Sequence, residues 1–187
     1  LAIIAGFALT VYLVSDFGYE PFTATRKIIW LGVFSTALGL LFGSSISNWR
    51  NWLLVALSGG ATVWTLLRIL EQQESSILFQ WGAACAAYVA LLVWSMDKLL
   101  GKDSLRVPCA ATALGLGTGG AALIGASALL GQLGLAIGAA AAAHWVIQLI
   151  SNQALPNGRM FTLPLSLIAG LIGCLAVLSA QLPWYAL

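Results

Sequence analysis

His144 is the residue with the clearest capacity for chemistry, because it is the chain's one histidine and lies within a long apolar run. Gln148 and Asn152 follow it by four and eight residues, so on a helix all three share one face. An ionisable side chain inside a membrane is by default a candidate functional group. The alternative is a purely structural role in an interhelical hydrogen bond, which contributes about 0.6 kcal/mol. The pattern therefore predicts a polar stripe that binds a solute or holds helices together.

Chemistry that needs several converging ligands is not favoured. A bis-histidine haem needs two histidines, and none of the predicted helices carries a set of His, Cys and carboxylate ligands for a metal. Cys85, Cys109 and Cys174 form no CxxC pair and lie in or beside apolar runs, which predicts small buried hydrophobic residues. We expect neither a cofactor nor a metal.

A serine nucleophile at Ser127 is the enzymatic alternative. The surrounding "GASA" resembles the GxS element of rhomboid-type intramembrane proteases, but the match covers only those residues. A serine nucleophile needs a base within hydrogen-bond reach. His144 is expected at a different depth of the membrane, so we expect no catalytic activity.

The acidic residues also give no indication of chemistry within the membrane. Glu71, Glu74, Asp97 and Asp103 lie between the apolar runs, where exposed ion pairs contribute about 0 to 1 kcal/mol. Because no acidic residue lies in the middle of an apolar run, coupling of transport to protons or sodium is not favoured.

Composition places the chain in a membrane. Of its 187 residues 60% are hydrophobic and 7% are charged, whereas soluble domains carry about 25% charged residues. A net charge of +2 provides no basic surface for a row of phosphates, so we expect no nucleic-acid partner.

Seven apolar runs predict a single all-α domain, a polytopic transmembrane helix bundle of about seven spans. The first run is shorter than the roughly 20 residues that cross a bilayer and lacks a methionine, so we expect further residues upstream. The predicted spans are residues 1–14, 28–47, 52–69, 77–96, 107–130, 133–150 and 161–182.

The uncharged stretch 107–150 must contain a reversal. As one helix its 44 residues would extend about 66 Å, against a hydrocarbon core of about 30 Å. Gly131 and Gln132 are the predicted turn, since glycine accepts a helix-end conformation. The competing break, "GLGTGG" at 115–120, would leave a first arm too short to span.

Small residues spaced by four predict close helix packing in this stretch. The fifth and sixth predicted helices should form a tight antiparallel hairpin, either at the centre of the bundle or against another subunit. The predicted contact residues are Gly115, Gly119, Ser127, Gly131, Gly134 and Gly138.

Charged loop residues indicate an orientation. Arg26, Lys27 and Arg68 fall on one predicted side, and five cations fall on the other, which the positive-inside rule makes cytoplasmic. These five are Arg50, Lys98, Lys102, Arg106 and Arg159. Tryptophans near the predicted helix ends are typical of an interfacial belt.

Two functions of different class are consistent with these features. The first is a non-catalytic subunit that scaffolds or anchors a larger membrane assembly, with the lipid bilayer and other membrane subunits as partners. The second is a transporter or channel-like protein for a small or apolar solute, using the His144 stripe. In either case we expect a multi-pass protein of a bacterial-type inner (plasma) membrane.

Overall fold

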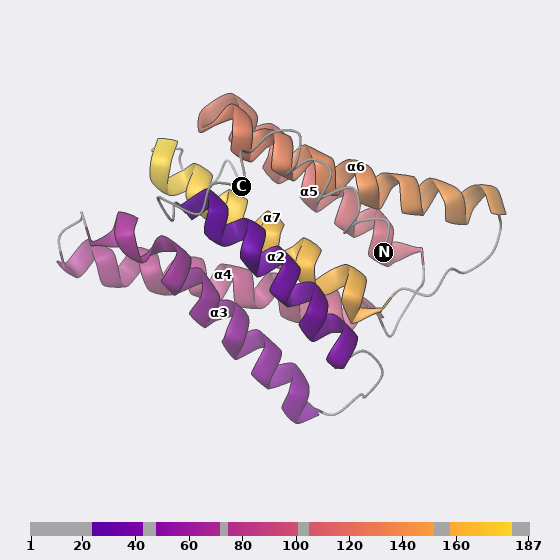
Figure 1. The fold of residues 1–187 in the computed structure, drawn as a ribbon, viewed down its shortest axis with the longest axis horizontal. Helices are drawn as coiled ribbons and strands as arrows, with labels where there is room; N and C mark the ends of the chain where they lie inside the picture. The colour runs from indigo at the N-terminus through magenta and orange to yellow at the C-terminus, as the bar shows by residue number, and fades with distance from the viewer. Residues whose placement is uncertain (1–23, 43–47, 72–74, 101–104, 152–157, 181–187) are drawn as a thin grey trace.

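The computed structural model describes residues 24–42, 48–71, 75–100, 105–151 and 158–180, and these are almost entirely helical (Figure 1). The predicted first span, Asn152 and the last residues of the chain lie outside the described residues. The helices are α2 (Ala24–Leu41), α3 (Asn48–Leu70), α4 (Ser75–Leu100), α5 (Arg106–Gly125), α6 (Ala128–Ser151) and α7 (Arg159–Ala180).

Five of the described helices, α3 to α7, are long and apolar enough to cross a membrane. This confirms a multi-pass helical membrane protein in its coarse form; the count of seven spans is not confirmed. Large apolar side chains also cover the outside of the bundle, among them Ile124, Ile150 and Phe79, each at least 75% exposed. A soluble monomer rarely exposes such extensive apolar surface, whereas lipid solvates it.

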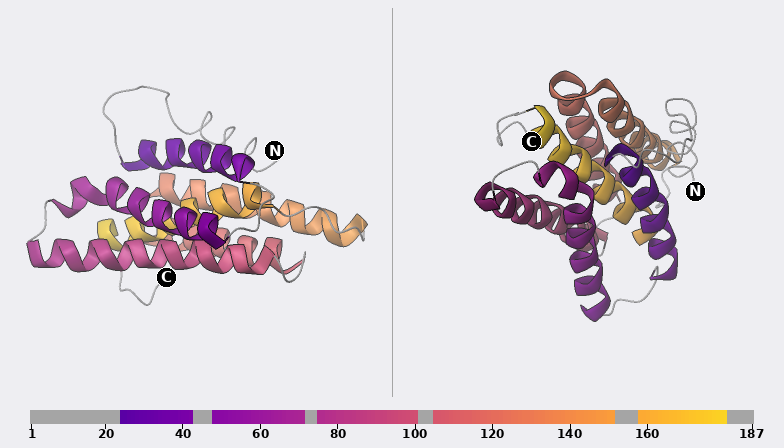
Figure 2. Two further views of the ribbon diagram at one scale, coloured as in Figure 1. Left: turned by 90° about the horizontal axis from the view of Figure 1, so that it is seen from below. Right: turned by 60° about the vertical axis from the view of Figure 1, so that its left-hand side comes forward.

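The core of the bundle is α7, which the other described helices surround (Figures 1 and 2). Every residue from 162 to 177 is buried. Its largest fully buried side chains are Leu165, Leu171 and Ile172. A helix that is apolar on all sides is expected at such a central position.

α5 and α6 lie against each other with their backbones in contact. A Cβ atom added to Gly115 would lie 2.6 Å from the Cα of Gly138, and one added to Gly134 would lie 2.5 Å from the Cα of Gly119. Real Cβ atoms do not approach backbone atoms so closely, so these positions require glycine. Gly131 packs in the same way against Leu123, because a Cβ added to Gly131 would lie 2.5 Å from the Cβ of Leu123.

The predicted turn at Gly131 and Gln132 is wrong, because α5 ends at Gly125 and α6 begins at Ala128. The N–H groups of Ala126 and Ser127 both donate to the carbonyl of Ala122, which closes α5. The Ser127 carbonyl then accepts the N–H of Gly131 and opens α6. Ser127 occupies the N-cap position of α6, which serine favours. Gly131 lies inside α6 and is used for close packing, so it does not form the turn. Ser127 is consequently exposed at the turn and lies outside the helix contact.

One end of the bundle, which we call the Arg159 end, gathers the starts of α3, α5 and α7 and the ends of α2, α4 and α6. Contacts of Arg159 with Phe42, Asn51 and Asp97 place four of these helix ends together. The ring contact between His144 and Phe161 adds the last third of α6. Because α5 runs antiparallel to α6, as the glycine contacts show, its start lies at the same end.

Candidate functional site

The structure brings His144 and Gln148 together on α6. Gln148 is buried, His144 is half-buried, and their Nε2 atoms are 3.4 Å apart. The imidazole also packs against Phe161 of α7, with ring centroids 5.0 Å apart and the planes tilted by 40°. The ring contact of His144 therefore joins α6 to α7, whereas the contact between Gln148 and His144 lies within α6. Asn152, its third member, lies outside the described residues.

The remaining predicted chemistry does not gather around His144. Ser127 and His144 lie near opposite ends of α6, about 25 Å apart along the helix at 1.5 Å per residue. Among the described residues, no group of three His, Cys, Asp or Glu side chains is close enough to hold a metal ion. Cys85 and Cys174 are buried, as predicted, whereas Cys109 is exposed on α5 because it lies on the outer face of that helix.

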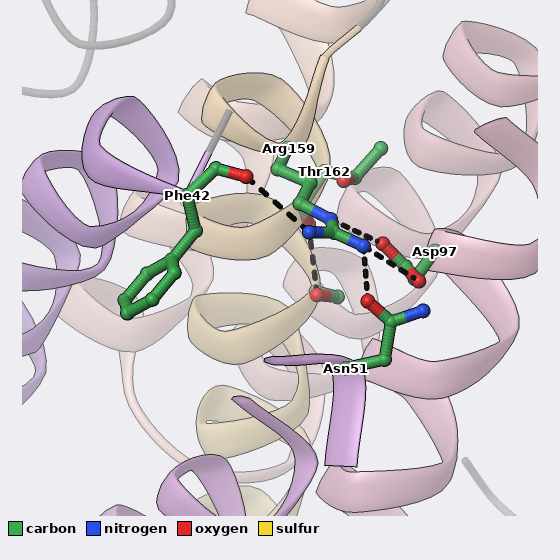
Figure 3. Close-up of polar contacts among 6 residues, drawn as sticks. Phe42, Asn51, Asp97, Arg159 and Thr162 are labelled. Atoms are coloured by element: carbon green, nitrogen blue, oxygen red, sulfur yellow. Dashed lines mark hydrogen bonds and ion pairs between the residues drawn. The ribbon is translucent and has the colours of Figure 1, made fainter. Parts of the chain in front are cut away.

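A second polar cluster lies at the Arg159 end and was not predicted. Nε of Arg159 donates to Oδ1 of Asp97 at 2.7 Å, and Nη2 lies 3.4 Å from Oδ2 of the same carboxylate. Nη2 also donates to Oδ1 of Asn51, and Nη1 donates to the carbonyl of Phe42 at 3.3 Å. Figure 3 shows the guanidinium between these groups from α2, α3 and α4. We call these four residues the Arg159 cluster.

Local packing brings the end of α2 within reach of this cluster. At Gly39 an added Cβ would lie 2.8 Å from the Cα of Met160 and 3.0 Å from the carbonyl oxygen of Arg159. The glycine therefore lets α2 touch the first turn of α7. One helical turn later, the carbonyl of Phe42 accepts a hydrogen bond from Arg159.

The Arg159 cluster is largely withdrawn from solvent. The side chains of Arg159 and Asp97 are 9% and 18% exposed. A buried charge is tolerated when it is paired and its remaining donors find acceptors, and the fork of an arginine can meet both oxygens of a carboxylate. The cluster therefore joins α7 to three other helices through one side chain.

Two further cations stack on aromatic rings at the Arg159 end, Arg50 on Phe42 of the cluster and Lys98 on Trp94 of α4. The guanidinium of Arg50 is 5.9 Å from the centroid of the Phe42 ring, and Nζ of Lys98 is 5.9 Å from that of Trp94. Arg50 is half-buried and Lys98 is exposed. Both distances are within the range of cation–π attraction.

Two small hollows adjoin the Arg159 cluster. A cavity of about 10 Å³, lined by Asn51, Asp97 and Arg159 among others, has room for about one water molecule. An open groove of about 60 Å³ runs from it between α2 and α3. Both are bounded by Leu54, Val93 and Leu163, so they are neighbours.

The expectation that Asp97 is an exposed loop charge is wrong. α4 continues four residues beyond the predicted span and carries Asp97 inside its last turn, next to the start of α7. The sequence signal was the placement of Asp97 directly after the fourth predicted span and of Arg159 two residues before the last one. Their separation of 62 residues gave no indication that the two would meet.

A basic side chain at the opposite end of the bundle is also held internally. Lys27 of α2 is buried, and its Nζ donates to the carbonyl of Trp64 in α3 at 2.9 Å. The same ammonium lies 4.6 Å from the centroid of the Trp64 ring. This contact ties the start of α2 to α3.

Comparisons with family models, curated proteins and solved structures find no match to this chain. The assignment of a function therefore depends on the geometry of the described helices.

Proposed function

We propose that this protein is a non-catalytic integral membrane subunit that scaffolds or anchors a larger membrane assembly, in a bacterial-type inner membrane. The observation that supports it is that side chains capable of chemistry are engaged in contacts that join helices. Arg159, Lys27 and His144 each contact a neighbouring helix. Within the described helices, hydroxyl groups donate to carbonyls of their own helix three or four residues earlier, as in Ser35, Thr62, Thr112, Thr118 and Ser166.

The transport alternative receives less support from the geometry. The two hollows beside the Arg159 cluster measure about 10 and 60 Å³, whereas a typical small-molecule pocket has about 300 to 1,000 Å³. The imidazole of His144 is engaged with Phe161 and Gln148. A bundle whose outer helices expose apolar faces is suited to lateral contact with other membrane proteins.

Purification in a mild detergent followed by native mass analysis tests the scaffold proposal. We expect the full chain to be recovered with other membrane proteins at a fixed stoichiometry, and a harsher detergent to release them. Recovery of a monomer alone under mild conditions, from a membrane in which the protein is expressed at its natural level, would contradict the proposal.

A flux measurement separates the alternative. In proteoliposomes, His144→Ala should leave the permeation of small solutes at the level of the exposed control Gln132→Ala. A specific flux that His144→Ala abolishes and Gln132→Ala retains would favour transport instead.

A further inference from the structure

The groove between α2 and α3 has a hydrocarbon-like lining. Leu31, Phe34 and Leu38 of α2 face Leu57 and Ala61 of α3, and Leu167 of α7 lies at its base. In the right-hand view of Figure 2, α7 is visible between the two helices. The two hydroxyl groups in the lining, Ser35 and Ser58, donate to carbonyls of their own helices. The groove therefore offers an apolar surface.

One end of the groove is cationic. It adjoins the small cavity lined by Arg159, Asp97 and Trp94. Arg50 lies against the Phe42 ring and Lys98 against Trp94, so with Arg159 this region carries three positive charges against the one negative charge of Asp97. Arg159 already donates to Asp97, Asn51 and Phe42, so Arg50 and Lys98 account for the net charge of +2. Trp49 is 74% exposed beside Arg50, as expected for a side chain at the membrane interface.

We propose that this groove is a binding site for one anionic glycerophospholipid. An acyl chain lies along the α2–α3 groove, and the phosphate group lies against Arg50 and Lys98. Basic positions between membrane helices attract anionic lipid head groups, by about 1 kcal/mol or fivefold in affinity for each cation.

The groove is open, and its volume of about 60 Å³ is far too small to enclose an acyl chain. The chain therefore lies along the apolar lining with its other side facing the bilayer. A zwitterionic phospholipid would match the apolar lining and offer the same phosphate, but its ammonium group repels the two cations and offsets the phosphate charge, so it should bind less tightly. The proposal is independent of whether the protein scaffolds an assembly.

Lipid titration of the delipidated full chain, followed by native mass spectrometry, tests the site. We expect phosphatidylglycerol to bind roughly 20-fold more tightly than phosphatidylcholine with the same acyl chains. The double variant Arg50→Gln/Lys98→Gln should lose this preference. The matched double variant Arg26→Gln/Arg68→Gln, which removes two cations at the opposite end, should retain it.

A second pair of variants separates the groove from general electrostatic attraction. Ala61→Phe fills the groove and keeps the charges, so it should weaken binding of both lipids severalfold. Ala84→Phe, on the exposed face of α4, should not. Each variant is accepted only if its thermal transition in detergent is cooperative.

Four results of the lipid titrations would overturn the proposal. They are equal affinity for the two lipids, the same loss in both double variants, unchanged binding in Ala61→Phe, and displacement of phosphatidylglycerol by soluble glycerol phosphate. The last would identify a site for a phosphate ester alone. A dimer in the lipid-free sample that does not respond to lipid would instead assign the groove to a second copy.

Discussion

At the scale of single residues, Arg159 connects α7 to neighbouring helices through one side chain. Its guanidinium has five N–H donors in a fixed plane, and the acceptors around it come from three other helices. Removing one partner of a buried ion pair leaves the other charge uncompensated, which costs about 3 to 5 kcal/mol. The free-energy cost of replacing Arg159 therefore comes mainly from the partner groups that are left unpaired.

The first prediction follows from that cost. Arg159→Gln and Asp97→Asn should each lower the free energy of unfolding by about 3 kcal/mol, and the double variant should lose less than the sum. Arg159→Lys should not restore stability, because a single ammonium cannot meet both carboxylate oxygens and Asn51. Thermal unfolding in detergent measures these changes. The exposed Arg68→Gln is the control, and an equal effect there would contradict the role of the cluster.

At this scale, a contact could be predicted from the sequence only when its two residues lie close together along the chain. The contact between His144 and Gln148 was predictable, because residues four apart on a helix are neighbours whatever the tertiary fold. The partners of Arg159 come from other helices and lie 62 to 117 residues away in sequence. Their meeting depends on how the helices pack, which local periodicity does not encode.

At the scale of elements, the α5–α6 contact gives a matched pair of adjacent glycines. A Cβ at Gly119 would lie 2.5 Å from the backbone nitrogen of Leu135, whereas Gly120 has nothing within 4 Å of the same position. Gly119→Ala should therefore destabilise the protein by about 1 to 3 kcal/mol through overpacking. Gly120→Ala should be neutral or stabilising by up to about 1 kcal/mol. Thermal unfolding compares the two, and equal stabilities would show that α5 and α6 do not pack this closely.

The contact between α4 and α7 can be tested through native cysteines. Sγ of Cys174 lies 3.9 Å from the carbonyl oxygen of Cys85, and both residues are buried between the helices. A short membrane-permeant reagent with two thiol-reactive groups should link them within one chain, as detected by peptide mass analysis. Cys109→Ala should retain the link and Cys85→Ala should abolish it. A link from Cys174 to Cys109 would be inconsistent with this packing.

The boundaries of these elements show where sequence patterns stop being informative. Hydropathy and length located the apolar runs that form α3 to α7, because a bilayer imposes a minimum span. The α5–α6 turn was misplaced because glycine serves both as a helix terminator and as a packing residue. Gly131 serves as a packing residue against Leu123 inside α6, and Ser127 provides the start of that helix.

At the scale of the whole molecule, the arrangement of helix ends allows a test of orientation. The Arg159 end carries Arg50, Lys98, Arg106 and Arg159, whereas Arg26, Lys27 and Arg68 lie at the other end. An excess of lysine and arginine favours the cytoplasmic side, so the Arg159 end should be cytoplasmic. This assignment also places the proposed lipid site in the leaflet where anionic lipids are attracted to basic residues.

Labelling of single cysteines checks that orientation. In a cysteine-free background, Ser151→Cys reports on the Arg159 end and Glu71→Cys on the opposite end, and both native residues are exposed. A membrane-impermeant maleimide should label Glu71→Cys in intact spheroplasts and Ser151→Cys only in inside-out vesicles. The reverse pattern would show that the charge difference does not set the orientation. Labelling of both positions from one side would contradict the fold itself, because the C-terminal ends of α3 and α6 would then lie on the same side of the membrane.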